Sequence, residues 1–291
     1  MFLKSVVSLL ISTSFSTRGF ADCESGVASR ADLKSYNFVI VPGIFNEIVP
    51  YYMTEYRRYL LDAGVPSRQI LRINNSTRKR PEEAAAEMLN RIKGMDKERE
   101  FIFFAHSKGA LETLYMLLDE GEKVRLKRVF LIQGALDGSA LYRLIILKEG
   151  SGVLLGMGRL VGKLPYVKDY SVSFSSSFVR EKMLGLSKQE NLLEKITFVE
   201  SDQSYKDLSF KFKLIGGFYN KTYMTSGDGI LLKSDHLPFE LQGSEEVCRK
   251  FYEADHGDLV KAAPWESGRI FKIKKFLDEI LFGLKGNKKG A

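Results

Sequence analysis

Short, continuous apolar runs alternate along this chain with segments in which apolar residues recur at helical spacing. The run at residues 38–41 is apolar throughout, as expected of a strand buried on both faces of a parallel sheet. Largely apolar segments predict further strands at residues 69–73, 128–133 and 196–199, and another strand opens the segment 100–119. The pattern therefore favours a sheet whose strands are separated by helices.

Helical segments follow most of these runs. One extends to Ala63, with Tyr52, Tyr56, Tyr59 and Leu60 towards one side, and Gly64 ends it. A second opens at Pro81, where the acidic Glu82 and Glu83 suit the positive end of a helix dipole. A third fills the later part of 100–119 and ends at Gly121.

Strands that alternate with helices predict an α/β fold with a mostly parallel central sheet and helices on both faces. Ligands of such sheets bind beyond the carboxyl ends of the strands. Ile44, Ser107 and Gly134 all lie at such positions in the sequence.

The pattern changes at about residues 138–190, where apolar stretches are punctuated by glycine. So many apolar residues need a surface to cover, which favours a cap inserted over a binding pocket. Ordinary packing of this segment onto the sheet is the alternative. We expect one domain, residues 22–291, that carries this insertion.

Residues 1–21 are typical of a secretory signal peptide. Lys4 lies in a short positive region, residues 5–15 are largely apolar, and Gly19 and Ala21 have the small-x-small form of a cleavage site. An N-terminal element of the fold is the alternative, and Asp22 argues against acylation of Cys23 as in a lipoprotein. The expected location is secreted or periplasmic.

Composition narrows the function classes. The 291 residues are 44% hydrophobic, which suffices for a single large core, and carry a net charge of +8. Part of the positive charge lies at residues 285–289, where a frayed basic end is the ordinary interpretation and a contact with a membrane surface is the sharper one. No interleaving of aromatic and basic residues suggests a nucleic acid.

Two cysteines, Cys23 and Cys248, complete this inventory. Export would permit a disulfide between them, but their spacing is equally compatible with two thiols. Nothing in the spacing suggests a metal site, and we expect neither a metal nor a cofactor.

The most informative feature is the segment from Phe101 to Ala110, an apolar strand that runs into Ala105-His-Ser-Lys-Gly109 and then into a helix. A sharp strand-to-helix turn of this kind presents one serine above the sheet edge, and it needs small residues on either side. Ser107 is therefore the candidate nucleophile. The backbone N–H of Lys108 is placed to face a developing oxyanion.

A serine hydroxyl needs a base, and this chain has three histidines, His106, His236 and His256. His106 precedes the serine and should point away from it. In a turn of this type the acid and then the histidine follow the serine along the chain, which leaves His236 and His256. His256 lies in a polar, glycine-bearing loop and is the favoured base, with His236 as the alternative.

The acid should follow a late strand. Asp228 lies in a glycine-flanked turn that could aim a carboxylate at the imidazole, and Asp235 is the alternative. A second oxyanion donor is expected in the loop after the first strand. There Gly43 allows a close approach, so the N–H of Ile44 is the candidate and that of Phe45 the next.

These motifs, in this order, resemble those of α/β-hydrolase lipases and esterases. The resemblance covers residues 37–283, with Pro42 and Ala105 as departures from the usual pattern. It implies an α/β-hydrolase fold with Ser107 as nucleophile, Asp228 as acid, His256 as base, and oxyanion amides at Ile44 and Lys108.

The implied activity is cleavage of carboxylic esters. The apolar segment 141–161 and the basic surface favour lipid esters. An amidase or thioesterase with the same triad, and a non-catalytic binding protein, are the alternatives.

Overall fold

We describe a computed structural model of the chain. It describes residues 26–44, 51–76, 79–137, 190–203, 247–262 and 264–283, together with residues 23, 46, 184, 206, 208, 227, 228, 231, 236, 237 and 241. The predicted signal peptide, the basic residues 285–289 and nearly all of the predicted cap lie outside the described residues.

The centre of the fold is a six-stranded sheet with strand order β2-β1-β3-β4-β5-β6, in which every neighbouring pair is parallel. The predicted strands are all present, with ends displaced by at most three residues. Their bounds are β1 Asn37–Val41, β2 Ile70–Arg72, β3 Phe101–His106, β4 Leu126–Ile132, β5 Ile196–Asp202 and β6 Cys248–Glu253.

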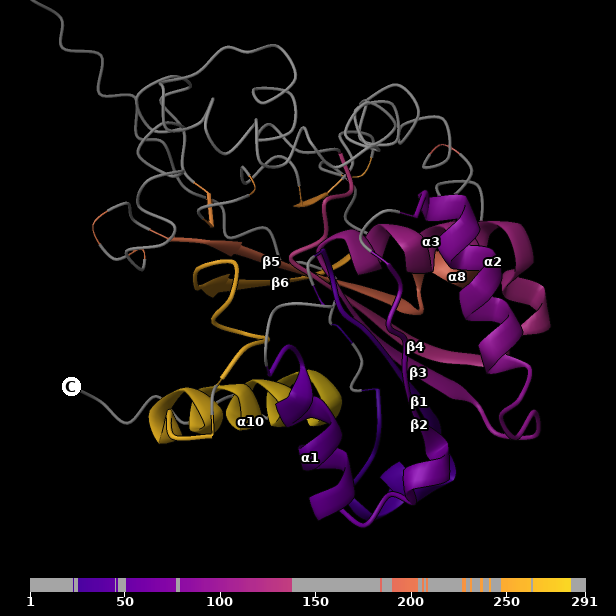
Figure 1. The fold of residues 1–291 in the computed structure, drawn as a ribbon, viewed down its shortest axis with the longest axis horizontal. Helices are drawn as coiled ribbons and strands as arrows, with labels where there is room; N and C mark the ends of the chain where they lie inside the picture. The colour runs from indigo at the N-terminus through magenta and orange to yellow at the C-terminus, as the bar shows by residue number, and fades with distance from the viewer. Residues whose placement is uncertain are drawn as a thin grey trace, which may run out of the picture.

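Helices cover both faces of the sheet, as predicted (Figure 1). The helices α2 Pro81–Ile92, α3 Lys108–Glu120 and α8 Glu190–Leu193 lie on one face, and α1 Thr54–Asp62 and α10 Ser267–Phe282 lie on the other. Short 3-10 helices occupy Ala31–Ser35, Ser67–Gln69 and Gly121–Lys123. Pro81 is the first residue of α2, with Glu82 and Glu83 in the first turn, as the sequence predicts.

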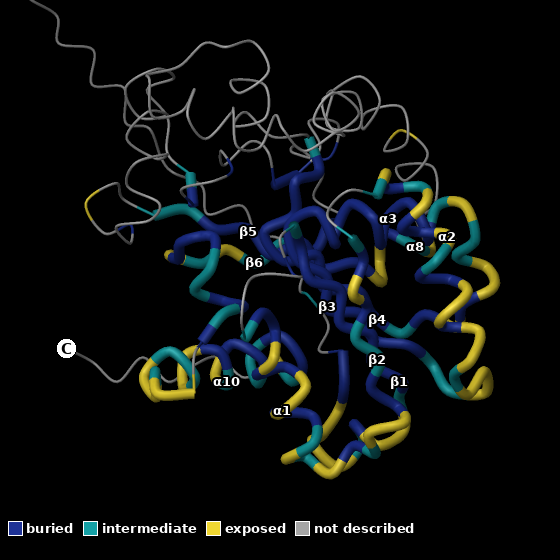
Figure 2. Tube along the Cα trace, viewed as in Figure 1, coloured by how far each residue is buried: buried dark blue, intermediate teal, exposed yellow. Residues whose placement is uncertain are grey.

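The four inner strands, β1, β3, β4 and β5, are buried almost throughout, while the outer surfaces of the helices are exposed (Figure 2). Alternate strand residues therefore belong to two separate apolar clusters. Val39 and Phe103 pack with α2 and α3, whereas Phe38 and Phe104 pack with α1 and α10. Continuous burial explains why these strands read as unbroken apolar runs.

The start of α1 differs from the prediction. The helix begins at Thr54, so Tyr52 precedes it instead of lying on its apolar side. Tyr52 forms an isolated antiparallel bridge with Lys261. Its two neighbours in the chain have positive φ, Tyr51 at 60° and Met53 at 51°. This backbone keeps Tyr52 buried at the carboxyl edge of the sheet instead of in the helix.

The sequence leaves the state of the two cysteines open, and the structure contains a disulfide between Cys23 and Cys248. Within the part of the chain that the structure describes, no helix has the length and apolar character needed to cross a bilayer. The same residues contain no cluster of three or more side chains suited to a metal ion.

Candidate active site

Ser107 occupies a strained turn between β3 and α3. Its φ of 54° and ψ of −123° are uncommon for a residue with a side chain. Gly109 makes this turn feasible, since a Cβ there would lie 2.5 Å from the carbonyl oxygen of Val41. The backbone N–H of Ser107 donates to the carbonyl of Ile132, which ties the turn to β4. Ser107 is thus held at the carboxyl edge of the sheet, where the sequence predicts it.

The structure brings Ser107, His256 and Asp228 into one hydrogen-bonded row. The Oγ of Ser107 lies 3.1 Å from Nε2 of His256, and Nδ1 of the same ring lies 2.6 Å from Oδ2 of Asp228. All three residues are buried. Hydrogen on Nδ1 leaves Nε2 bare, so the imidazole can accept the serine proton.

Asp228 is held as a carboxylate by its neighbours. Burial alone would raise its pKa, but the charge and hydrogen bond of His256 outweigh this and lower the pKa to about 2. Its Oδ1 accepts the backbone N–H of Leu231 at 2.8 Å, and its Oδ2 also accepts the hydroxyl of Ser201 at 3.3 Å. Asp228 is therefore ionised at neutral pH.

His236, the alternative base, lies beside the acid instead of the serine. Its Nε2 is 3.4 Å from Oδ2 of Asp228, and its side chain is fully buried. Burial lowers the pKa of His236 and keeps the ring neutral. Asp235, the alternative acid, lies outside the described residues.

The loop after β6 presents His256. Within it, Oδ1 of Asp255 accepts the backbone N–H of Gly257 at 2.9 Å, and Asp258 pairs with Arg269 of α10 at 3.1 Å. The backbone N–H of His256 donates to the carbonyl of Asp228 at 2.9 Å. His256 and Asp228 are thus joined through the main chain as well as through their side chains.

The loop after β1 lies against the serine. A Cβ on Gly43 would come within 2.7 Å of the Cβ of Ser107, so only glycine allows this approach. Ile44 follows directly and is partly buried. Asn46 holds the loop, because its Nδ2 donates to the carbonyls of Gly43 at 3.2 Å and Asn75 at 2.7 Å. Phe45 lies outside the described residues.

Lys108 is the first residue of α3, and its side chain is directed away from the serine. The ammonium pairs with Glu112, and it also donates to the carbonyl of Lys79 at 2.9 Å. The carboxylate of Glu112 accepts a second hydrogen bond from Asn75 at 2.8 Å. The charge of Lys108 is therefore held in a buried ion pair.

The sequence matches no protein-family model and no curated protein. Solved structures do match. A metagenomic carboxyl esterase, MGS0156, superposes with a TM-score of 0.60 at 18% identity, over 85% of this chain and 72% of its own. The mature form of the Bacillus licheniformis lipase BlEst2 gives 0.59 at 15% identity, over 86% and 94%. This chain has the α/β-hydrolase fold.

The sequence does not predict that four further polar residues of this α/β-hydrolase fold belong to the site: Tyr52, His106, Gln133 and Ser201. They form a buried set of hydrogen bonds behind the row of Ser107, His256 and Asp228. Both ring nitrogens of His106 have polar partners within this set. The one available signal was position, because His106, Gln133 and Ser201 lie at or near the carboxyl ends of β3, β4 and β5.

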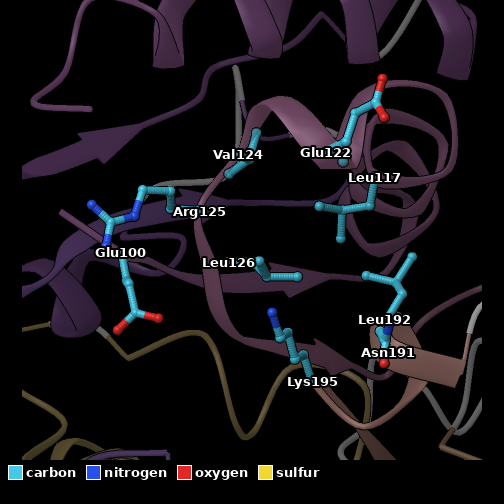
Figure 3. A pocket seen from close by; sticks show the side chains of 10 residues that line it. Glu100, Leu117, Glu122, Val124, Arg125, Leu126, Asn191, Leu192 and Lys195 are labelled. Atoms are coloured by element: carbon cyan, nitrogen blue, oxygen red, sulfur yellow. The ribbon is translucent and has the colours of Figure 1, made fainter. Parts of the chain in front are cut away.

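A separate hollow of about 860 Å³ lies at the opposite edge of the sheet (Figure 3). Its lining includes Glu100, Leu126 and Lys195, which are at or next to the first residues of β3, β4 and β5. In an α/β-hydrolase fold the chemistry belongs to the other ends of these strands. We assign this hollow no part in the site of Ser107.

Proposed function

We propose that this chain is an exported serine hydrolase that cleaves carboxylic esters through an acyl-enzyme. The observation that carries the proposal is the hydrogen-bonded row of Ser107, His256 and Asp228 at the carboxyl edge of the sheet. The α/β-hydrolase fold, shared with an esterase and a lipase, supports ester hydrolysis as the general class of reaction.

In this mechanism Oγ of Ser107 attacks the ester carbonyl carbon while Nε2 of His256 takes the hydroxyl proton. Asp228 fixes the tautomer of the imidazole and stabilises the imidazolium that forms. When the tetrahedral intermediate collapses, the carbon–oxygen bond to the alcohol breaks and His256 returns the proton to the leaving oxygen. Water then attacks the acyl-serine by the same steps and releases the acid.

The carbonyl oxygen becomes an anion in each tetrahedral intermediate. The backbone N–H groups of Lys108 and Ile44 are the proposed donors to it. The proximity of Gly43 to Ser107 supports this assignment, as does the place of Lys108 at the N-terminus of α3, where the helix dipole favours negative charge. One such donor contributes about 10²–10³-fold in turnover in enzymes of this chemistry.

The test is labelling with a fluorophosphonate probe, which reacts with activated serines. Wild-type protein should be labelled, Ser107→Ala should not, and His256→Ala should react slower by ~10³-fold or more, since its serine lacks a base. Labelling that persists in Ser107→Ala would contradict the proposal. A folded wild type that never reacts would point to a binding protein of this fold.

Matched ester, thioester and amide substrates with one acyl group would then separate the leaving groups. Ester substrates with acyl chains of graded length test the narrower proposal that the natural substrates are lipid esters. Turnover that rises with chain length, and rises again above the solubility limit, supports a lipase. A preference for short acyl chains without such a rise would restrict the proposal to a soluble-ester esterase, and faster thioester or amide cleavage would reassign the class.

Export is supported by the disulfide between Cys23 and Cys248, since disulfides persist in oxidising compartments. We therefore place the working protein in the periplasm or outside the cell, after removal of residues 1–21. N-terminal sequencing of the protein recovered from the periplasm or medium tests this. A chain that retains Met1 and stays in the cytoplasm would contradict it.

A membrane-surface contact is part of the same proposal. Trp265 is 76% exposed and Phe271 is 68% exposed, and the exposed Lys272 and Lys275 lie on the same side of α10. Aromatic residues beside lysines suit the interface of an anionic bilayer. Trp265 is the only tryptophan, so its emission should shift to the blue with phosphatidylglycerol vesicles. Phosphatidylcholine vesicles are the control, and equal spectra with both would contradict the contact.

A further inference from the structure

Gln133 is the centre of the polar set behind the candidate triad. Its side chain is fully buried, and its φ of 47° is unusual for a residue other than glycine. The Nε2 group donates to Oγ of Ser201 at 2.6 Å and to the carbonyl of Asp255 at 2.8 Å. Oε1 lies 3.0 Å from Nε2 of His106. One carboxamide thus joins β3, β5 and the loop that presents the base.

The chemistry of these partners fixes the direction of each hydrogen bond. The carbonyl of Asp255 can only accept, so the carboxamide must turn its NH₂ group towards it and its oxygen towards His106. His106 must then carry hydrogen on Nε2, which also faces the carbonyl of His256 at 3.1 Å. Its Nδ1 is left bare, as an acceptor.

Tyr52 supplies the donor that this bare nitrogen needs. Its hydroxyl lies 2.6 Å from Nδ1 of His106 and accepts a hydrogen bond from the backbone N–H of Gly43. The set therefore begins at the loop that carries the proposed oxyanion amide of Ile44. At its other end the hydroxyl of Ser201, which accepts from Gln133, donates to Oδ2 of Asp228.

We propose that Tyr52, His106, Gln133 and Ser201 are positioning residues that hold the oxyanion loop, the base and the acid in one reactive arrangement. The inference rests on the proposed function, since it assigns these residues to the same reaction. Each link is satisfied in only one orientation, so the set fixes three loops that are far apart in the sequence. Loss of one link should reduce turnover more than substrate binding, because geometry is needed most in the transition state.

Two variants remove single hydroxyls at the two ends of the set. Ser201→Ala frees Oδ2 of Asp228 from one donor, and Tyr52→Phe removes the donor to His106. Two other variants are the matched controls. Thr197→Val also removes a buried hydroxyl from β5, and Tyr59→Phe removes one from α1. Among the described residues, neither control hydroxyl has a hydrogen bond to a member of the set.

We expect Ser201→Ala and Tyr52→Phe each to lower kcat by about 5–50-fold with KM changed less than about threefold, as loss of a supporting contact around reactive groups does. The double variant should lose less than the product of the two single losses, since residues of one network are not additive. The controls should keep wild-type kcat. Losses confined to KM, or kcat within twofold of wild type for both variants, would overturn the proposal.

Nitrogen-15 NMR of the histidine rings provides a readout that needs no substrate. In wild type at pH 7 the His106 ring should be neutral, with hydrogen on Nε2, and Tyr52→Phe should perturb the ring of His256 as well. Unchanged His256 signals in Tyr52→Phe would overturn the network whether or not the protein hydrolyses esters. Absence of fluorophosphonate labelling with coupled ring signals would overturn the proposed function alone.

Discussion

At the scale of single residues, the site is organised around one carboxylate oxygen. Oδ2 of Asp228 accepts from Nδ1 of His256 and from the hydroxyl of Ser201, and Nε2 of His236 lies close to it. An acceptor surrounded by donors is ionised easily, which explains a pKa near 2 in spite of complete burial. Replacing this acceptor by a hydrogen-bond donor should therefore change the tautomer of the neighbouring His256 ring.

Asp228→Asn tests this directly. An amide that turns its NH₂ towards Nδ1 of His256 selects the tautomer with hydrogen on Nε2, so the ring can no longer accept the serine proton. We expect kcat for ester cleavage to fall by ~10³–10⁴-fold, as in triads of this kind, with the far-UV circular dichroism unchanged. Turnover within tenfold of wild type would remove Asp228 from the proposed mechanism.

Two buried neutral histidines give stability a predictable pH dependence. Burial lowers the pKa of His106 well below its usual value, with the charge of His256 acting in the same direction, and burial also lowers that of His236. The unfolded chain binds these protons below pH ~6.5, whereas the native protein does not. The free energy of unfolding should therefore fall as pH drops from about 6.5 to 5, by up to ~1.4 kcal/mol per unit for each histidine.

Urea unfolding at several pH values measures this slope, and His236→Gln supplies the comparison. The variant lacks one of the two titrating groups, so its slope should be smaller than that of wild type by as much as ~1.4 kcal/mol per pH unit. Equal slopes for the two proteins would show that His236 takes up its proton in the native state.

At the scale of elements, the turn between β3 and α3 depends on the close contact of Gly109 with β1. A Cβ there would lie 2.5 Å from the carbonyl oxygen of Val41 and 2.6 Å from that of Pro42, and neither backbone group can move without disturbing the loop before Ile44. Gly109→Ala should lower the melting temperature by about 10 °C or more and abolish labelling of Ser107.

Gly268→Ala is the matched control for this prediction. Gly268 lies in the first turn of α10, and a Cβ there would meet no atom within 4 Å. Alanine should therefore leave labelling unchanged and leave stability equal or higher by up to ~1 kcal/mol. Similar melting temperatures for the two variants would mean that the turn at Ser107 tolerates a side chain.

The elements that the sequence predicted well are those whose signal is local. Continuous burial makes β1 and β3 unbroken apolar runs, and the small residues around Ser107 are required by the turn itself. The edge strand β6 was missed because its residues alternate between partly buried and exposed after Cys248. A half-exposed edge strand carries no continuous apolar run.

The candidate site divides in the same way. Ser107 and His256 could be proposed from short motifs and from the small number of histidines, but Gln133 could not. Its role depends on where β3, β5 and the loop at Asp255 meet, and such pairings over long sequence distances leave no pattern along the chain. Tyr52 was assigned to helix α1 for a related reason, since its spacing matches the helix although its backbone does not.

At the scale of the whole molecule, the N-terminal segment is bound both to the strand that leads to His256 and to the C-terminal helix. Cys23 is bonded to Cys248, the first residue of β6, and the backbone N–H of Val27 donates to the carbonyl of Leu281 in α10 at 3.1 Å. The loop with His256 follows directly after β6. The N-terminal segment thus holds β6, which lies at the end of the strand order formed by the described residues.

The disulfide closes a loop with a sequence separation of 225 residues, so its loss should be costly. Cross-linking limits the unfolded chain more as the loop grows, and we expect Cys23→Ala/Cys248→Ala to lower the free energy of unfolding by about 2–5 kcal/mol. Denaturant titration with and without a reducing agent measures this, and the reductant should affect wild type only. Neither sulfur contacts the candidate triad, so kcat should stay within about twofold at temperatures where the variant is folded.

An unchanged unfolding midpoint would show that β6 is held by its pairing with β5 alone. A large loss of kcat in a fully folded variant would instead mean that the N-terminal segment positions His256.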